Sequence, residues 1–182
     1  ELERRGLGTA APVAWFEQRS GDDLTRNWYV CAHVGGQLSI GTLFSAYARG
    51  ESTHAGIAAG QAYAALAAFL LHMHGRGIFF RDLSGGNILV QQADGRTRFK
   101  LIDTARTRVV AKGLPRSKRL ADLTRATHKL NAAGREVLLQ HYFNTHGKPL
   151  AASVRLRFAV YDHKARLKRR LRQSAAYQAM KR

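Results

Sequence analysis

A short hairpin with polar residues at its open end constrains the fold of this chain more than any other feature. Two strand-forming runs, Ile88 to Gln92 and Phe99 to Ile102, flank a segment that contains Asp94-Gly95, a strong hairpin signal. Folding the chain about this turn brings Asn87 and Asp103 opposite each other at the open end. The sequence therefore predicts an amide oxygen and a carboxylate that converge on one point.

This pair of oxygen ligands suits magnesium, which prefers hard ligands and usually keeps several waters and substrate phosphate oxygens. Asp82 lies five residues before Asn87 on the same loop, so it can sit beside the metal without binding it. It is then free to accept the proton of a substrate hydroxyl. We therefore predict that Asp82 is the catalytic residue of a phosphoryl transfer and that Asn87 and Asp103 hold magnesium against the phosphates of ATP.

These residues also carry a family resemblance. Arg81-Asp82-Leu83 with Asn87 resembles the kinase catalytic loop H-R-D-L-x-x-x-N, and Asp103-Thr104-Ala105 stands where D-F-G would be. The whole chain is similar to the lipopolysaccharide kinase (Kdo/WaaP) family, small atypical bacterial kinases that phosphorylate sugars of the lipopolysaccharide inner core. The likeness runs through Arg5-Gly6-Leu7-Gly8-Thr9-Ala10-Ala11-Pro12-Val13, His74-Gly75-Arg76-Gly77-Ile78, Leu101-Ile102-Asp103 and Arg119-Leu120-Ala121-Asp122-Leu123.

The resemblance implies an α+β, protein-kinase-like fold that consists mainly of the helical large lobe. Residues 1–34 would be a remnant of the small lobe, with a helix end, two strands and the hinge. Residues 35–182 would be the large lobe with the catalytic loop and the metal-binding hairpin. The first twenty residues contain no glycine-rich loop and no lysine in a Val-Ala-Ile-Lys setting, so we expect a fragment that lacks much of the small lobe. Glu1 or Glu3 is a candidate for the helix glutamate that would pair with that lysine.

The segment His33-Val34-Gly35-Gly36 has two interpretations. In kinases the chain runs extended past the adenine here, so the resemblance makes Ala32 and His33 the residues whose backbone would contact the nucleotide. The alternative is an ordinary hairpin exit with a glycine turn.

Two positions depart from the pattern of protein kinases, and a third position has a structural role that the resemblance implies. Phe80 stands at a position that is usually histidine; a phenylalanine can pack there but cannot donate a hydrogen bond. Ser84 replaces the lysine that contacts the transferred phosphate in many serine/threonine kinases. The resemblance further implies that Asp122 is buried and accepts hydrogen bonds from the backbone of the catalytic loop, the alternative being a solvated helix acid.

Periodicity and turn residues predict the remaining elements. Thr104 to Pro115 lacks a clear period and is expected to be the activation segment, short enough to favour a small or glycan substrate. The apolar run from Ala62 to Leu71 is too short to cross a bilayer and is expected in a buried helix. The predicted elements are strands over Ala11–Gln18 and Asn27–Ala32, and helices over Leu38–Arg49, from a Ser52-Thr53 cap to about Met73, over Leu120–Leu130, over Gly134–Phe143 and, interrupted or bent, over Ser153–Met180.

Charge and cysteine content narrow the possible partners. The 182 residues include 30 Lys and Arg against 12 Asp and Glu, a formal net charge of +18, which favours polyanions such as nucleotide, anionic lipid and nucleic acid. Nucleic acid is the least favoured, because no recognisable nucleic-acid-binding motif accompanies the charge. The single cysteine, Cys31, excludes an internal disulfide and lies in an apolar run, which predicts that it is buried.

The end of the chain is strongly basic. From Arg155 to Arg182 there are ten basic residues against one acid, Asp162, and apolar residues interleave them. A basic amphipathic helix of this kind is typical of proteins that bind a membrane surface. We expect its apolar stripe to pack on the lobe while its charged face is attracted to anionic lipid.

Together these features predict an ATP-dependent kinase that phosphorylates a sugar hydroxyl of the lipopolysaccharide inner core. Its partners would be the lipopolysaccharide core or another anionic glycolipid, and an anionic membrane surface. The protein would lie in the cytoplasm, peripheral to the inner membrane. Two alternatives remain open: a protein or small-molecule kinase on the same scaffold, and a noncatalytic pseudokinase or basic binding module.

Overall fold

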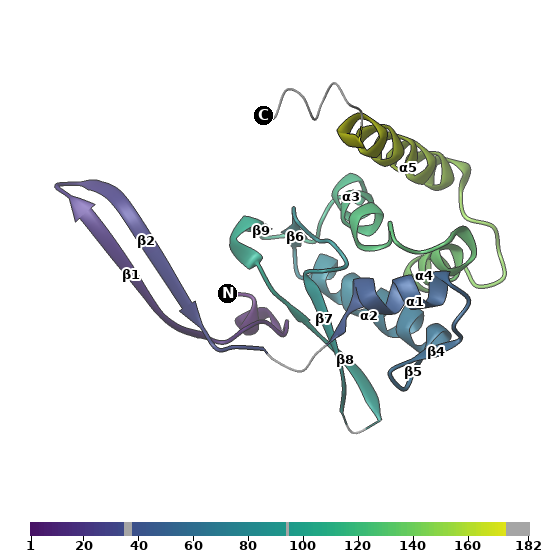
Figure 1. The fold of residues 1–182 in the computed structure, drawn as a ribbon, viewed down its shortest axis with the longest axis horizontal. Helices are drawn as coiled ribbons and strands as arrows, with labels where there is room; N and C mark the ends of the chain where they lie inside the picture. Colours follow the sequence, from purple (N-terminus) through teal and green to yellow (C-terminus); the bar gives the residue numbers. More distant parts are fainter. Residues whose placement is uncertain (35–37, 94, 174–182) are drawn as a thin grey trace.

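The predicted central hairpin is present in the computed structural model, which describes residues 1–34, 38–93 and 95–173 (Figure 1). Strand β7 (Ile88–Ala93) pairs antiparallel with β8 (Arg96–Leu101), and the short strand β3 (Leu38–Ser39) pairs with the other edge of β7. The register runs from Ile88 opposite Leu101 to Ala93 opposite Arg96. Asp94, in the predicted turn, lies outside the described residues.

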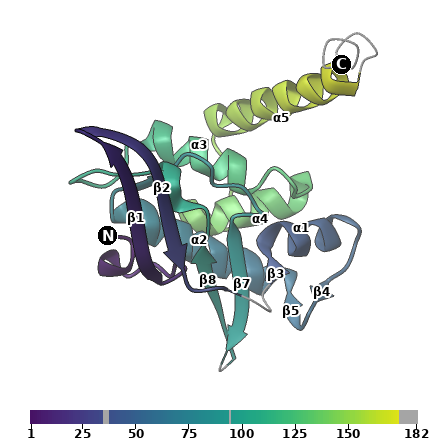
Figure 2. The ribbon, with the colours of Figure 1, turned by 60° about the vertical axis from the view of Figure 1, so that its left-hand side comes forward.

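Helices form most of the body beside this sheet (Figures 1 and 2). The longest buried helix contains the apolar run that was predicted to be buried, and Leu66, Leu70 and Met73 on it are fully buried in the core. This helix packs against the fourth helix, so one core joins the two. The helices are α1 (Ile40–Ala48), α2 (Ala59–Gly75), α3 (Arg116–Ala126), α4 (Ala132–Phe143) and α5 (Ala152–Gln173).

The prediction of the start of α2 was wrong. Ser52 and Thr53 do not cap this helix; they lead into a small hairpin of β4 (Thr53–His54) and β5 (Ile57–Ala58), and α2 begins after it without a side-chain cap. Its turn holds two residues with positive φ, and Ile57 is buried, with its carbonyl accepting a hydrogen bond of 2.8 Å from the hydroxyl of Tyr47. Burial of Ile57 and this bond outweigh the local capping pattern.

The other helices differ from the predictions mainly at their ends. α3 starts at Arg116, four residues before the predicted start. Pro115 stands at its N-cap, and the carbonyl of Pro115 accepts the first hydrogen bonds of the helix, from the N–H groups of Lys118 and Arg119. α5 is one continuous helix from Ala152 to Gln173, so the predicted interruption is absent from this range. The predicted continuation to Met180 lies outside the described residues.

A second hairpin projects from the body (Figure 1). Its strands are β1 (Pro12–Ser20) and β2 (Asp23–Cys31), longer than predicted and joined by a turn with Gly21 at φ +61°. Both faces are open: Trp15 is 75% exposed and Trp28 is 48% exposed. Cys31 is exposed as well, which contradicts its predicted burial. An apolar run is buried only if another layer covers it, and none of the described elements covers this hairpin.

The N-terminal segment is tied to the central sheet. After a short 3-10 helix, η1 (Glu3–Arg5), the chain forms a parallel bridge between Thr9 and Leu101, and Leu101 N–H donates to the carbonyl of Gly8 at 2.9 Å. A Cβ on Gly8 would lie 2.7 Å from the carbonyl oxygen of Phe99, so this close approach requires glycine. The bridge places residues 9 and 10 beside the end of β8.

The chain enters and leaves the candidate site through another pair of strands. β6 (Ile78–Phe80) leads into the loop that contains Asp82, and it pairs antiparallel with β9 (Thr107–Val109). A short 3-10 helix, η2 (Thr104–Arg106), connects Asp103 to β9. The segment after Asp103 is therefore held against the entry to the loop.

A buried carboxylate fixes the start of that loop, as the resemblance implied. Asp122 on α3 is fully buried, and its carboxylate accepts hydrogen bonds from the backbone N–H of Phe80 at 3.2 Å and from Nε2 of His74 at 3.3 Å. Arg125 on the same helix donates to its other oxygen. Phe80 itself is fully buried, so it packs as expected.

The ring of His74 extends this network to a third helix. Its Nε2 faces the carboxylate and so donates, while Nδ1 lies 2.7 Å from the hydroxyl of Tyr142 on α4. Burial raises the pKa of the Tyr142 phenol, so the hydroxyl keeps its proton near neutral pH. The network thus joins α2, α3 and α4 to the loop.

Removing this carboxylate should destabilise the whole domain. We expect Asp122→Ala to lower the free energy of unfolding by about 3 kcal/mol, because it leaves buried donors without their acceptor. Asp122→Asn, which keeps one oxygen acceptor, should cost less. Urea unfolding followed by far-ultraviolet circular dichroism measures both.

The matched control is Glu136→Ala, an exposed acid on α4. It should change the free energy of unfolding by no more than about 0.5 kcal/mol. If the Asp122→Ala protein were as stable as this control, the network would not hold the fold together.

Candidate active site

The loop between β6 and β7 is fixed by hydrogen bonds within itself. Ser84 N–H donates to the Asp82 carbonyl at 2.7 Å, and Asn87 N–H donates to the Ser84 carbonyl at 3.0 Å. The side-chain Nδ2 of Asn87 also donates to the Asp82 carbonyl, at 2.9 Å. Leu83 is fully buried and anchors the loop in the core. The amide nitrogen of Asn87 is therefore occupied, and its oxygen Oδ1 is the part that can bind a cation.

Asn87 and Asp103 lie at the same end of the hairpin, with a small offset from the prediction. The backbone N–H of Ile102 donates to the Asn87 carbonyl at 3.0 Å, one step beyond the pair of Ile88 and Leu101. Asn87 is thus opposite Ile102, and Asp103 is one residue further along. The offset arises because the register of the strands places their last paired residues at positions 88 and 101.

The backbone of Asp103 adopts a left-handed conformation, with φ 55° and ψ 50°. A non-glycine residue rarely adopts this conformation, and such residues concentrate at functional sites where the surroundings hold them. Here the hairpin on one side and η2 on the other fix the residue. Asp103 is exposed and lines a large cavity.

Asp82 has an ionic partner that the sequence did not reveal. Nη1 of Arg106, on η2, lies 3.1 Å from Oδ1 of Asp82, and both side chains reach solvent. The two residues are 24 positions apart in the sequence. The pairing of β6 with β9 brings them together. The sequence places Arg106 only within the predicted activation segment, Thr104 to Pro115.

A large cavity, of about 870 Å³, contains three of the predicted site residues. Ala32 and His33 line one part of it and Asp103 another, so they share a space of the size that a nucleotide requires. Leu89 and Ile102 add an apolar surface. The full lining is Thr9, Ala10, Tyr29, Cys31, Ala32, His33, Val34, Leu89, Ile102, Asp103, Thr104 and Ala105. Gly35 and Gly36 of the predicted hinge lie outside the described residues.

The other two predicted residues, Asp82 and Asn87, line a second cavity of about 290 Å³. The structure therefore divides the predicted set between two cavities, whose walls are joined by the hydrogen bond from Ile102 to Asn87. The second cavity is rich in groups that can bind anions. Its lining is Arg81, Asp82, Ser84, Asn87, Arg125, His128 and Tyr161.

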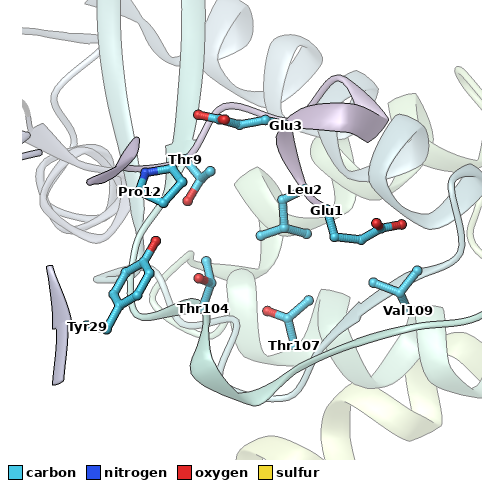
Figure 3. A pocket seen from close by; sticks show the side chains of 9 residues that line it. All are labelled: Glu1, Leu2, Glu3, Thr9, Pro12, Tyr29, Thr104, Thr107 and Val109. Atoms are coloured by element: carbon cyan, nitrogen blue, oxygen red, sulfur yellow. The ribbon is translucent and has the colours of Figure 1, made fainter. Parts of the chain in front are cut away.

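A third cavity, of about 250 Å³, lies beside the N-terminus (Figure 3). Glu1 and Glu3 line it together with Thr104 and Thr107, as Figure 3 shows. Arg5 and Arg4 donate to the Glu1 carboxylate at 2.8 and 2.7 Å, and these hydrogen bonds and charges lower the pKa of that carboxyl group. Glu1 is thus already paired with arginine. The assignment of Glu1 or Glu3 as the helix glutamate stays a prediction.

The chemistry of the donors fits magnesium better than a transition metal. No group of three or more His, Cys, Asp or Glu residues that could hold a metal occurs within residues 1–34, 38–93 and 95–173. Magnesium commonly takes one or two carboxylates and completes its shell with water and substrate phosphates. The Asp103 carboxylate and Oδ1 of Asn87 match that pattern, and their assignment as magnesium ligands stays a prediction.

A close contact between two glycines positions the loop. Gly41, at the start of α1, donates its N–H to the Gly85 carbonyl at 2.8 Å. A Cβ on Gly85 would lie 2.9 Å from the Cα of Gly41, which is too close for a real contact. The loop can approach α1 in this way only because both residues lack side chains.

Comparison with known proteins identifies the family of the chain. The sequence model of the lipopolysaccharide kinase (Kdo/WaaP) family matches residues 1–142. The chain belongs to this family. Among curated protein sequences none matches the chain. The family makes the protein a kinase, that is, a phosphotransferase, as the sequence predicted.

One solved structure, that of WaaP, shows the same fold. WaaP in complex with acyl carrier protein is similar with a TM-score of 0.66 and 21% identity, over 91% of this chain and 71% of that chain. The Rio2 kinase from Chaetomium thermophilum is similar with a TM-score of 0.44 in its ADP/Mg²⁺-phosphoaspartate complex, at 13% identity, over 92% of this chain and 51% of that chain. The α+β, protein-kinase-like fold is thus confirmed. The division into lobes at residues 34 and 35 stays a prediction.

Several residues that shape the site were not predicted as parts of it. His74 supplies a ring hydrogen bond to the Asp122 anchor, while Phe80 stands at the usual histidine position. Tyr161, from α5, reaches the cavity at Asp82 from almost eighty residues away in the sequence. Only the resemblance around His74-Gly75 offered a signal, and none pointed to Tyr161.

The glycine contact predicts a selective effect on catalysis. Gly85→Ala should push the loop away from α1 and lower kcat by roughly 10-fold to 100-fold, since small displacements of catalytic groups have effects of this size. Steady-state kinase kinetics on the full-length protein measure it.

Gly86→Ala is the matched control, because a Cβ there would meet only the Ser84 hydroxyl, at an ordinary distance of 3.7 Å. Its kcat should stay within about twofold of the unsubstituted protein, an effect too small to reflect displaced catalytic groups. Equal losses in the two variants would show that the glycine contact does not position the loop.

Proposed function

We propose that this protein transfers the γ-phosphoryl group of ATP to a sugar hydroxyl of the lipopolysaccharide inner core. The observation that carries the proposal is the cavity at Asp82, which combines a candidate base with Arg81, Arg125 and His128. An acceptor that already carries phosphate or carboxylate groups suits these basic residues. The family of the chain supports the lipopolysaccharide core as the source of that acceptor.

The roles of the site residues follow from their positions. The adenine of ATP would lie in the larger cavity, where the backbone of Ala32 and His33 can contact its edge. Asn87 and Asp103 would hold magnesium, which when bound neutralises charge on the nucleotide phosphates. Asp82 would orient the acceptor hydroxyl and take its proton as the phosphorus–oxygen bond forms.

Arg106 supplies a positive charge where Ser84 does not. Its guanidinium lies 3.1 Å from the carboxylate of Asp82, which is where the acceptor oxygen and the moving phosphoryl group must meet. We infer that it contacts the transferred phosphoryl group and exchanges the Asp82 carboxylate for phosphate oxygens as the substrates bind. An exposed pair of this kind is weak enough to open at little cost.

The same cavity bears on the alternative functions. Its arginines would repel a cationic acceptor such as an aminoglycoside. They therefore favour a kinase of an anionic glycolipid over a kinase of cationic small molecules. A noncatalytic binding module would have no physical need for the fixed loop, the strained Asp103 and an acid facing the cavity together. A protein acceptor remains the second candidate, because the short activation segment does not forbid a flexible peptide.

The place of action follows from the acceptor. Lipopolysaccharide core is built on a membrane-embedded lipid, so we place the protein in the cytoplasm, peripheral to the inner membrane. In the described part of the chain, no helix combines the length and apolarity that crossing a bilayer demands.

The proposal predicts that Asp82 is essential. In the full-length protein, Asp82→Asn should lower the rate of phosphate transfer from ATP to delipidated core oligosaccharide by roughly 10²-fold to 10⁴-fold, the usual contribution of a general base. Transfer of radiolabelled phosphate, with and without magnesium, measures this rate. Asp22→Asn, in the exposed turn of the N-terminal hairpin, is the control and should leave the rate unchanged.

Each outcome of that assay has a meaning. Equal rates for the Asp82→Asn protein and the control would remove Asp82 from the mechanism. Magnesium-dependent transfer to protein, with none to the sugar, would move the function to the second candidate.

Arg106 should affect the chemical step more than nucleotide binding. Arg106→Gln should lower kcat by roughly 10-fold or more while changing the KM for ATP little, because its charge is needed where the phosphoryl group moves. Arg106→Lys should restore part of the loss. The neighbouring exposed base Arg108 provides the control variant, Arg108→Gln, and a kcat for Arg106→Gln equal to that control would contradict the role.

A further inference from the structure

Helix α5 has two apolar faces, and among residues 1–34, 38–93 and 95–173 other elements pack on only one of them. Val154 and Phe158, near its start, are buried in the core. On the same side Asp162 forms an ion pair with Arg135 on α4, with an N–O distance of 2.6 Å, and Tyr161 lines the cavity at Asp82. This inner face attaches α5 to the body and to the candidate active site.

The opposite face carries a second apolar stripe. At about 100° per residue, the side chains of positions 156, 160, 167 and 171 fall within an arc of about 60°, on the side of the helix away from Val154 and Phe158. These residues are well exposed: Leu156 65%, Val160 44%, Leu167 50% and Leu171 57%. The prediction that the apolar stripe packs on the lobe therefore holds for Val154 and Phe158 and is wrong for this outer stripe.

Basic residues border the outer stripe on both sides, and no acid lies on it. Lys164 and Lys168 follow one edge of the stripe, and Arg166 and Arg170 follow the other. The one acid of α5, Asp162, is turned toward Arg135. The C-terminal end of the helix points away from the rest of the molecule (Figure 2). The outer stripe is thus a straight apolar ridge between two rows of positive charge.

We propose that this outer stripe docks on the anionic surface of a lipid bilayer, with the axis of α5 parallel to the membrane. A helix with an apolar stripe between rows of Lys and Arg lies in the interface in this way, its bases reaching the head groups. The stripe from Leu156 to Leu171 is about 22 Å long, so it can lie along a flat surface over four helical turns. Charge complementarity therefore identifies the occupant as anionic lipid.

A protein partner fits these features less well. A protein groove that binds a helix usually covers a few anchor residues and makes specific polar contacts around them. Here the bases are spread along both edges of the ridge, and their long side chains favour a surface with many equivalent anionic groups. An acidic protein is therefore the alternative that the experiment must exclude.

The docking would bring the active site close to the membrane, a step that rests on the proposed function. Tyr161 faces the cavity at Asp82 from the inner side of α5, and the outer stripe lies on the other side of the same helix. The helix with its side chains is about 10–12 Å across, so the cavity would stand about that far above the lipid head groups. An acceptor sugar that stands a few sugar units out from the lipid reaches such a height.

The test uses the full-length protein without nucleotide and vesicles of phosphatidylethanolamine with phosphatidylglycerol. The double variant Leu156→Ser and Leu167→Ser should bind at least 10-fold more weakly than the unsubstituted protein in co-sedimentation. The matched control, Val110→Ser with Val137→Ser, removes two exposed apolar residues elsewhere and should bind as before. Circular dichroism confirms that both variants keep their helices.

Charge is tested in the same way. Lys164→Gln with Lys168→Gln should weaken binding, whereas Lys112→Gln with Lys148→Gln, which removes the same charge from other parts of the surface, should weaken it less. Binding should fall with added salt and on replacement of phosphatidylglycerol by phosphatidylcholine. If the double serine variant binds vesicles as well as its control, the proposal is overturned.

Acyl carrier protein, the partner in the solved WaaP complex, serves as the protein probe. If the double serine variant loses affinity for this protein while vesicle binding is unchanged or absent throughout, the stripe is a protein-docking surface and the proposal fails. If the double serine variant binds vesicles more weakly than the unsubstituted protein, but the unsubstituted protein phosphorylates no core sugar, the docking is supported and only the proposed function is contradicted. If the docking and the proposed function are both correct, the double serine variant should have a higher KM for acceptor in vesicles than the unsubstituted protein. Its kcat on delipidated oligosaccharide should be unchanged.

Discussion

The buried carboxylate of Asp122 is the interaction on which the rest of this structure depends. It lies where three helices meet and binds the backbone just before the catalytic loop, so the packing of the core sets the position of the loop. A buried charge is tolerated only with several partners, and here Phe80, His74 and Arg125 supply them. The hydrogen bonds to these helices fix the start of the loop, although the loop itself is not helical.

Around that anchor, the site is assembled from short-range and long-range contacts of different kinds. The hairpin of β7 and β8 brings Asn87 and Asp103 to one end by local pairing. The pairing of β6 with β9 then brings Arg106 to Asp82. One chain segment thus provides the candidate metal ligands and the next provides a positive charge at Asp82. The role proposed for Arg106 would explain how the site can have Ser84 in place of a lysine.

The parts of this fold that could be predicted are those that local pattern determines. The hairpin follows from two strand-forming runs and a turn, and the burial of Asp122 follows from a resemblance that reflects the same packing. The start of α2 could not be predicted, because the burial of Ile57 decides it. The contact between Arg106 and Asp82 and that between His74 and Asp122 join residues 24 and 48 positions apart, and no periodicity encodes such pairs. The exposure of Cys31 depends on what covers a strand, which its own sequence does not specify.

The exposed hairpin of β1 and β2 also determines how this molecule can be observed. Both tryptophans of the chain, Trp15 and Trp28, lie on it, in contact with solvent and outside the helical core. Intrinsic tryptophan emission will therefore report on the environment of this hairpin and not directly on the packing of the helical core. A decrease or blue shift of this emission on addition of nucleotide would report binding at the neighbouring cavity, because Tyr29 on β2, next to Trp28, lines that cavity.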